Sequence, residues 1–393
     1  MKKYIQDFIW NQLKSLLKEW FSLPQEKAIR EITRGLLKEN TPVLRLLSQD
    51  PSKQAKYQWM RFSKHLWNIC LEKKVETYCF KKSFKNLTKD SIIAYDLWDI
   101  NKDSARKMWW LSKVMDGSKR RVCIWYVLYG VCLNGFPIKM WIQNKNNENQ
   151  NELRKRIVDE VKIKCWDKWI YVFDRGNDKV SFMNYLNDDL AVRYIIRLKR
   201  NRNIVLKWES QKRKITELKP GKYIVHFMKP NSSKVNYEKS YTVVVNHDFK
   251  SKHPIILLTN LDTNRYENKQ ITDFYLNRWW IEKIYKRMKT KFGMEKIRLL
   301  KIKKVENLIY LIQFLIALTK DFYNKIVCIN SLIYSGIQLF FKHFLKKKNL
   351  YSNVDSFISF LKENTDFLIF RKKVKSQQLD IFHCKGIKKM PPF

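Results

Sequence analysis

The chain has 393 residues, of which 45% are hydrophobic, so it is long enough for two or three domains and too apolar for a disordered protein. Lysine and arginine number 79 against 37 aspartate and glutamate residues, which gives a net charge of +42. Such an excess would repel itself in one compact body, and it indicates a polyanionic partner, most commonly nucleic acid.

A membrane surface is the competing polyanion, but the sequence argues against insertion into a membrane. The apolar stretch 308–318 is shorter than the about 20 residues that a transmembrane helix needs. At the N-terminus, Lys14 and Lys18 interrupt the apolar run of a possible signal peptide. The seven cysteines form no C-x-x-C pair, which favours free thiols in a reducing compartment. We therefore expect a protein of the bacterial cytoplasm that associates with the nucleoid and not with a membrane.

Residues 1–88 are predicted to be helical. Three helix starts are indicated by a capping residue that stands one or two positions before a proline, at Ser22, Thr41 and Asp50. The segment 54–67 interleaves lysine and arginine with aromatic residues. This mixture favours contact with the DNA backbone; the alternative is a packed helix with a basic outer face. We predict that residues 1–88 form a helical DNA-binding region.

The pattern changes after residue 88 to alternating strands and helices. Strands are predicted at 91–95, 121–131, 137–143, 169–173 and 191–199, and helices at 148–165 and 180–186. The order is three strands, helix, strand, helix and strand. It predicts an α/β protein with a ribonuclease-H-like fold, in which a mixed sheet is flanked by helices.

The rest of the chain continues this core and adds to it. Residues 203–260 contain several short β patterns and are predicted to form a β-rich insertion. The catalytic core is then expected to comprise 89–202 and 261–300, and its last helix to span 275–289 without a break, because that stretch has no proline or glycine. A helical C-terminal region is predicted at 301–393, with helices at 305–322, 331–345 and 354–362.

One face of the predicted helix 275–289 combines a single acid with cations. Within an arc of about 60° it carries Tyr275, Arg278, Glu282 and Lys289. A lone carboxylate that is flanked by cations, beside a buried face, suits the binding of a metal ion next to a phosphate. The alternative is a solvated helix with ordinary ion pairs.

Two further acids stand at the ends of predicted strands. Asp96 directly follows the strand 91–95, and Asp174 directly follows the strand 169–173. Groups at the carboxyl ends of parallel strands converge on one crevice. Together with Glu282 they would form a site for a hard cation, Mg²⁺ or Mn²⁺. Two such ions, about 4 Å apart, can drive an in-line displacement at phosphorus.

These residues resemble the DDE transposases of the insertion-sequence-four group. Tyr275, Arg278, Glu282 and Lys289 match the Y-x2-R-x3-E-x6-K signature of that group. The segment 95–108, followed by Asp116, is similar to its first-aspartate region, and 172–178 (VFDRGND) to its second-aspartate motif. A β insertion before the glutamate is also a feature of the group.

The resemblance implies a function for the chain and roles for its residues. The expected function is cleavage at the inverted-repeat ends of a mobile element, followed by joining to target DNA, with two Mg²⁺ or Mn²⁺ ions. The metal-binding and catalytic residues are expected to be Asp96, Asp174 and Glu282. The resemblance assigns the DNA-binding role to Tyr275, Arg278 and Lys289, and we add Arg175 as a cation beside the metal site.

The partners would be double-stranded DNA, as element ends and as target, and a second copy of the chain in a homodimer. The alternatives are a ribonuclease-H-like nuclease or resolvase, and a catalytically inactive DNA-binding protein.

Two assignments keep an alternative. Asp99 lies close to Asp96, but Asp96 is favoured as the first acid because it directly follows the apolar run. The two cannot point to the same face of a continuing strand. Trp279 and Trp280 are expected to pack in the core, and the alternative is that one of them stacks on an unpaired base.

Overall fold

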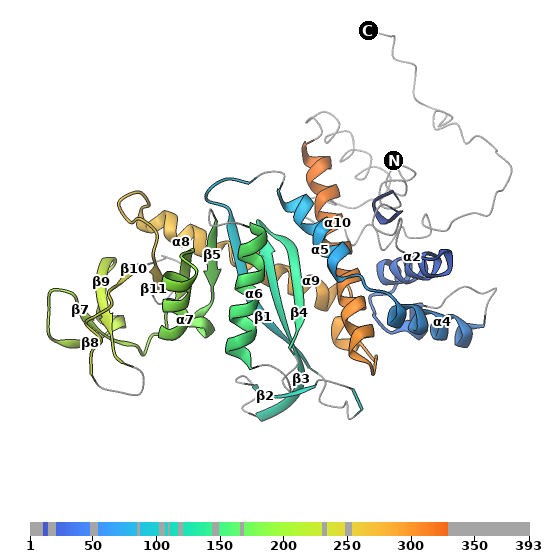
Figure 1. The fold of residues 1–393 in the computed structure, drawn as a ribbon, viewed down its shortest axis with the longest axis horizontal. Coiled ribbons are helices and arrows are strands. Elements are labelled where there is room, and N and C mark those ends of the chain that lie inside the picture. Colours follow the sequence, from blue (N-terminus) through green and yellow to red (C-terminus); the bar gives the residue numbers. More distant parts are fainter. Residues whose placement is uncertain are drawn as a thin grey trace, which may run out of the picture.

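A computed structural model describes residues 11–14, 21–47, 54–84, 87–101, 107–108, 111–116, 121–143, 149–165, 169–229, 234–247 and 254–328. In this part of the chain, helices flank one large mixed sheet, and further helices gather at one end of the molecule (Figure 1). The predicted C-terminal helices 331–345 and 354–362 lie outside the described residues, as does Asp50.

Five strands form the core of the sheet. They are β1 (Ile92–Asn101), β3 (Arg121–Leu133), β4 (Phe136–Ile142), β5 (Ile170–Phe173) and β6 (Arg193–Arg197). Their spatial order is β4-β3-β1-β5-β6, in which β4, β3 and β1 pair antiparallel and β1, β5 and β6 pair parallel. This topology confirms the predicted ribonuclease-H-like mixed sheet.

Six more strands extend this core at both edges. The short β2 (Ser112–Asp116) pairs with β3. The other edge continues through β11 (Ile255–Thr259), β10 (Tyr241–Asn246), β9 (Gly221–Phe227), β7 (Asn203–Leu206) and β8 (Lys212–Lys214). Because β11 pairs antiparallel with β6, the strands of the predicted insertion 203–260 belong to the same sheet as the core.

The two faces of the sheet are covered by different helices. On one face, α6 (Gln150–Cys165) and α7 (Val180–Asn184) share a hydrophobic cluster with Tyr95 and Phe173. On the other face lie α8 (Asn268–Leu276), α9 (Trp279–Thr290) and α10 (Ile302–Cys328), which bury Ala94 and Val172. Successive strand residues point to opposite faces, so this division fixes where each side chain of β1 and β5 points.

The N-terminal helices gather around α10. They are α2 (Leu23–Lys38), α3 (Leu44–Leu47), α4 (Ala55–Asn68) and α5 (Glu72–Ser83). The predicted start at Ser22 is confirmed, because the Ser22 backbone N–H donates to Gln25 Oε1 at 2.9 Å in a capping box. Asn307 of α10 donates from Nδ2 to the carbonyl oxygens of Leu66 (3.0 Å) and Ile69 (3.1 Å), which holds α10 against the end of α4.

Short irregular turns complete the described chain. They are η2 (Arg175–Asn177), η3 (Tyr185–Asp189), η4 (Ile215–Glu217) and η5 (Met294–Lys296). The predicted helix 305–322 lies within α10. Among the described residues, no helix combines the length and the apolar character needed to cross a membrane.

The expectation of one unbroken helix over 275–289 is wrong. Helix α8 ends at Leu276 and α9 begins at Trp279, with a tight turn at Asn277 and Arg278. In this turn the N–H groups of Trp280 and Ile281 bond to carbonyl oxygens three residues back, at 3.0 and 3.1 Å. Such i→i−3 bonds tighten the chain relative to the α-helix and change its direction.

Candidate active site

The pairing of β1 with β5 brings the two predicted aspartates together. Tyr95 lies opposite Phe173 at the end of the parallel register, so Asp96 and Asp174 occupy the next positions on neighbouring strands. Such strands are about 4.8 Å apart. Asp96 shares the face of Ala94, and Asp174 shares the face of Val172, which is the face that α8 to α10 cover.

Asp96 differs in one respect from its predicted place. The strand does not end at residue 95, because β1 continues to Asn101 and Asp96 pairs with Gly130 of β3. Only the parallel pairing with β5 stops at Tyr95. Asp99 is partly exposed and, three residues along the strand, faces the opposite side from Asp96. This alternation favours Asp96 as the first acid.

Helix α9 carries the third acid to the same place. The Arg278 guanidinium at its start donates from Nη1 to Asp96 Oδ2 at 2.6 Å and from Nη2 to Glu282 Oε1. Three residues after Glu282, the Tyr285 hydroxyl donates to the backbone oxygen of Asp96 at 2.7 Å. The start of α9 is thus fixed to β1, and Glu282 and Asp96 share one cation.

The pKa of Asp96 reflects its burial and its charged neighbours. Burial raises the pKa of Asp96 to about 7, and the positive charge of Arg278 lowers this pKa only in part. The charges of Asp174 and Glu282 both raise it further. The pKa of Asp96 therefore depends on the charges of both other predicted acids.

Asp174 is partly buried at the end of β5. Strand β5 ends at Phe173, and the chain turns through η2, whose Asn177 donates from Nδ2 to Asp174 Oδ1 at 2.5 Å. Sequence reasoning missed Asn177, although it stands within the VFDRGND segment, and it also missed Tyr285. Asn177 holds the Asp174 carboxylate, and Tyr285 holds the backbone of Asp96.

The predicted DNA-binding residues divide into an exposed and a buried pair. Arg175 is exposed at the turn after β5, and Lys289 is exposed on α9, where it pairs with Glu295 at 2.8 Å. In contrast, Tyr275 is 2% exposed and Arg278 is 8% exposed. The Arg278 guanidinium lies 5.8 Å from the centre of the Tyr275 ring. In this structure Arg278 therefore faces the carboxylates, and Tyr275 lies beside its guanidinium.

The donor set suits a hard divalent cation, since it consists of carboxylate oxygens whose mutual repulsion a cation would relieve. In the described part of the chain, however, no group of three or more His, Cys, Asp or Glu side chains is placed to surround a metal ion. Arg278, between Asp96 and Glu282, supplies the positive charge instead. Metal binding at these acids would thus require Arg278 to exchange its partners.

The two tryptophans at the start of α9 have different environments. Trp280 is partly buried against the core, and the Lys320 ammonium lies 5.8 Å from its ring centre. Trp279 is 52% exposed. The expected core packing therefore describes Trp280 and not Trp279.

A comparison with protein families identifies the class of protein to which the chain belongs. A family model described as the transposase DDE domain matches residues 88–319, which is more than half of the chain. The chain therefore belongs to the DDE transposase family, a class of metal-dependent polynucleotidyl transferases.

Among solved structures, the chain is similar to a piggyBac transposase in a synaptic complex with hairpin DNA. The two are 10% identical with a TM-score of 0.46, over 94% of this chain and 82% of that chain. No curated protein matches the chain.

Proposed function

We propose that this protein is a cut-and-paste transposase of the insertion-sequence-four group. It cleaves double-stranded DNA at the inverted-repeat ends of a mobile element and joins these ends to target DNA. The observation that carries the proposal is geometric: Asp96 and Asp174 follow the last paired residues of neighbouring parallel strands, and Arg278 binds both Asp96 and Glu282. Three acids from two parallel strands and one helix, in a chain of net charge +42, suit phosphoryl transfer on a polyanion.

We assign the binding of two Mg²⁺ or Mn²⁺ ions to Asp96, Asp174 and Glu282. When bound, such ions activate a water molecule or a 3′ hydroxyl and stabilise the leaving oxygen. The side chains of the protein position the reacting groups. Asn177 holds the Asp174 carboxylate, and Tyr285 holds the backbone of Asp96.

Arg278 acts as a movable cation in this proposal. Its fork binds two carboxylates in this structure, and a phosphate offers the same two-oxygen geometry. We propose that Arg278 turns to a DNA phosphate when the acids take up their metal ions. Tyr275, buried beside the guanidinium, positions it, while the exposed Lys289 and Arg175 bind phosphates along the element end.

The remaining regions have supporting roles in the proposal. The helical region 1–88 binds DNA, the core 89–202 with 261–300 performs the reaction, and 203–260 and 301–393 are the insertion and the C-terminal region. A homodimer holds two element ends in the DNA complex, at the nucleoid in the cytoplasm.

Asp174→Ala tests the reaction directly. The substrate is a duplex that carries the element end, taken from the DNA flanking the reading frame. The variant should bind this duplex as the wild type does, yet lose cleavage in Mg²⁺ and in Mn²⁺. Asp188→Ala, at an exposed acid that pairs with Lys239, is the matched control and should cleave normally. Unchanged cleavage by Asp174→Ala would remove Asp174 from the mechanism.

Products on a plasmid target separate transposition from the alternatives. A transposase should join the cleaved end to the plasmid, whereas a nuclease or resolvase should cut and stop. A DNA-binding protein without activity should do neither. In every case the affinity for DNA should fall steeply with salt, because binding releases counterions from the phosphates.

A further inference from the structure

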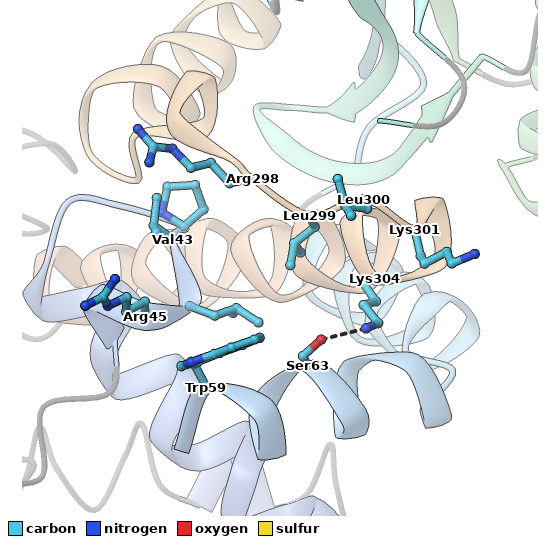
Figure 2. A pocket seen from close by; sticks show the side chains of 11 residues that line it. Val43, Arg45, Trp59, Ser63, Arg298, Leu299, Leu300, Lys301 and Lys304 are labelled. Atoms are coloured by element: carbon cyan, nitrogen blue, oxygen red, sulfur yellow. Dashed lines mark hydrogen bonds between the residues drawn. The ribbon is translucent and has the colours of Figure 1, made fainter. Parts of the chain in front are cut away.

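A pocket of about 560 Å³ lies between the N-terminal helices and the segment that enters α10 (Figure 2). Its lining comes from three places: the start of α3, one side of α4 and residues 298–304. None of the lining residues belongs to the candidate active site. The pocket therefore needs an explanation of its own.

The centre of the pocket is apolar and contains one aromatic ring. Leu44, Leu299 and Leu300 line it, and the Trp59 indole extends into it from α4. Helix α4 buries Phe62 and Leu66 in the core, while Trp59 remains 37% exposed. The indole therefore leaves part of its surface open to a ligand.

The apolar centre is surrounded by cations. Figure 2 shows Arg45 and Arg298 on one side of Trp59, and Lys301 and Lys304 on the other. None of the described residues that line the pocket is acidic. Lys304 donates from Nζ to Ser63 Oγ at 2.6 Å, so its ammonium group is held at the edge of the pocket.

The local field is also positive. Burial lowers the pKa of the Lys304 ammonium, and the charge of Lys301 lowers it further. A ligand that brings negative charge would relieve this repulsion.

We propose that this pocket binds an unpaired nucleobase of DNA, which stacks on Trp59 while its flanking phosphates lie against the surrounding cations. An aromatic platform inside a positive rim is the arrangement by which proteins hold single-stranded nucleic acid, and stacking is worth about 1–3 kcal/mol per base. Base-paired DNA keeps its bases inside the duplex and cannot place one on the indole. The inference rests on the proposed function only in taking DNA as the partner.

Binding of labelled oligonucleotides to the full chain tests the proposal. The probes are a single-stranded thymidine 12-mer, a duplex of the same length and a single-stranded 12-mer of abasic sites. Trp59→Ala should weaken the binding of the thymidine probe by roughly tenfold, which corresponds to about 1.4 kcal/mol. The affinity of Trp59→Ala for the duplex should stay within about twofold of the wild-type affinity, since duplex binding relies on phosphate contacts.

The abasic probe isolates stacking from charge. The wild type should prefer the thymidine probe over the abasic probe by about the same factor of ten, and Trp59→Ala should lose this preference. Trp59→Phe should retain most of it. Trp208→Ala, at a tryptophan that is 63% exposed between β7 and β8, is the matched control and should bind all three probes normally.

Three outcomes would overturn the proposal. The first is an unchanged affinity of Trp59→Ala for the thymidine probe. The second is an equal loss of affinity for the duplex and the single-stranded probe. The third is a change in the oligomeric state of Trp59→Ala without a change in DNA binding. The last would mean that the pocket receives a second copy of the chain. Loss of cleavage in Asp174→Ala does not affect these measurements, so failure here and failure of the proposed reaction are distinguishable.

Discussion

The guanidinium of Arg278 lies 2.6 Å from Oδ2 of Asp96, and both residues are less than a tenth exposed. The same guanidinium also binds Glu282. Burying charged groups costs free energy unless each meets an opposite charge. Arg278 is thus the countercharge of the buried acid in this structure. It therefore belongs to the candidate active site in addition to its proposed role in binding DNA.

Replacing this countercharge should destabilise the protein. Arg278→Gln leaves the Asp96 carboxylate buried without its cation, and we expect the free energy of unfolding at pH 8 to fall by about 2–3 kcal/mol. Urea denaturation measures the loss. Lys289→Gln is the control on the same helix, since the Lys289 side chain is 54% exposed and its ion pair with Glu295 should contribute less than about 0.5 kcal/mol. Equal effects of both variants would contradict the assigned role of Arg278.

The raised pKa of Asp96 predicts how stability depends on pH. Burial raises this pKa to about 7 in the folded protein, whereas an unfolded aspartate titrates near 4, as a rough reference value. The protonated Asp96 carboxyl therefore makes its full contribution to the free energy of unfolding below about pH 4. This contribution is lost as the pH rises through about 7. Asp96→Asn has no carboxyl group to titrate at this position and should therefore remove this decline of stability with rising pH.

Denaturation at several pH values between 4 and 8 measures this effect. The exposed Asp188→Asn should keep the pH slope of the wild type, and a similar slope in Asp96→Asn would argue against a raised pKa. Mg²⁺ gives a second readout. It should raise the melting temperature of the wild type more at pH 8 than at pH 6, because protons compete for the same oxygens, and it should have little effect on Asp96→Asn.

The sequence predicted the parts of the site that depend on local patterns. Asp96 and Asp174 each follow a buried apolar run, and alternation along a strand then determines which face they share. The meeting of Glu282 with these acids depends on how α9 packs on the sheet, which no local pattern specifies. It was expected from the charge pattern of the segment 275–289 and from the resemblance to a known family. The Arg278–Asp96 pair, 182 positions apart in sequence, was not expected for the same reason.

Other features left no signal in the sequence. The turn between α8 and α9 uses ordinary right-handed dihedral angles, with φ of −63° at Asn277 and −54° at Arg278. Such angles require neither glycine nor proline, so the break could not be predicted from composition. The pairing of β11 with β6 joins segments about 60 residues apart along the chain, and local β patterns do not indicate which strand pairs with which.

Gly130 should be essential for the close approach of α9 to the sheet. It lies opposite Asp96 in the β1–β3 pairing. A Cβ atom here would collide with the Tyr285 hydroxyl and would lie 2.9 Å from Sδ of Met140. Gly130→Ala should therefore displace Tyr285, lower the free energy of unfolding by about 1–3 kcal/mol and reduce cleavage of element ends.

A double variant tests the cause of this loss. Gly130→Ala with Tyr285→Phe lacks the colliding hydroxyl, so it should be more stable than the sum of the two single effects predicts. Gly221→Ala is the control at another strand glycine. The three atoms nearest to its Cβ would belong to the Tyr223 side chain, at 3.2–3.4 Å, so the substitution should cost less than about 1 kcal/mol. Simple additivity of Gly130→Ala and Tyr285→Phe would refute the collision.

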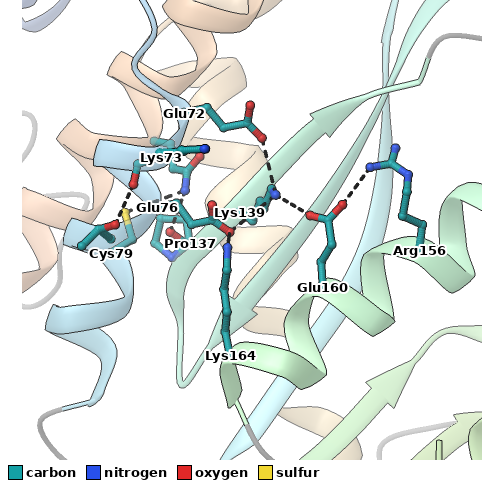
Figure 3. A network of polar contacts seen from close by, with 11 residues as sticks. Glu72, Lys73, Glu76, Cys79, Pro137, Lys139, Arg156, Glu160 and Lys164 are labelled. Carbon is teal, nitrogen blue, oxygen red and sulfur yellow. Dashed lines mark hydrogen bonds and ion pairs between the residues drawn. The ribbon is translucent and has the colours of Figure 1, made fainter.

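A buried lysine joins the N-terminal helices to the sheet (Figure 3). Lys139 of β4 lies 2.5 Å from Glu160 of α6, and 3.4 and 3.5 Å from Glu72 and Glu76 of α5. Lys164 provides Glu76 with a second cation. Burial lowers the pKa of Lys139, but the hydrogen bond that Lys139 donates to Glu160 and the surrounding negative charges outweigh this effect and raise the pKa. Its stabilising charge is therefore fully present at pH 7.

Lys139→Met should uncouple these elements without leaving a cavity. The variant leaves the buried Glu76 with Lys164 alone, and the free energy of unfolding at pH 7 should fall by about 2–3 kcal/mol. Arg156→Met is the matched control, because Arg156 binds the same Glu160 from one turn away but is 47% exposed, so its loss should cost less than about 0.5 kcal/mol. Urea denaturation compares the two. If Lys139→Met leaves the free energy of unfolding unchanged, Lys164 alone compensates the charge of Glu76, and apolar packing alone holds α5 to β4.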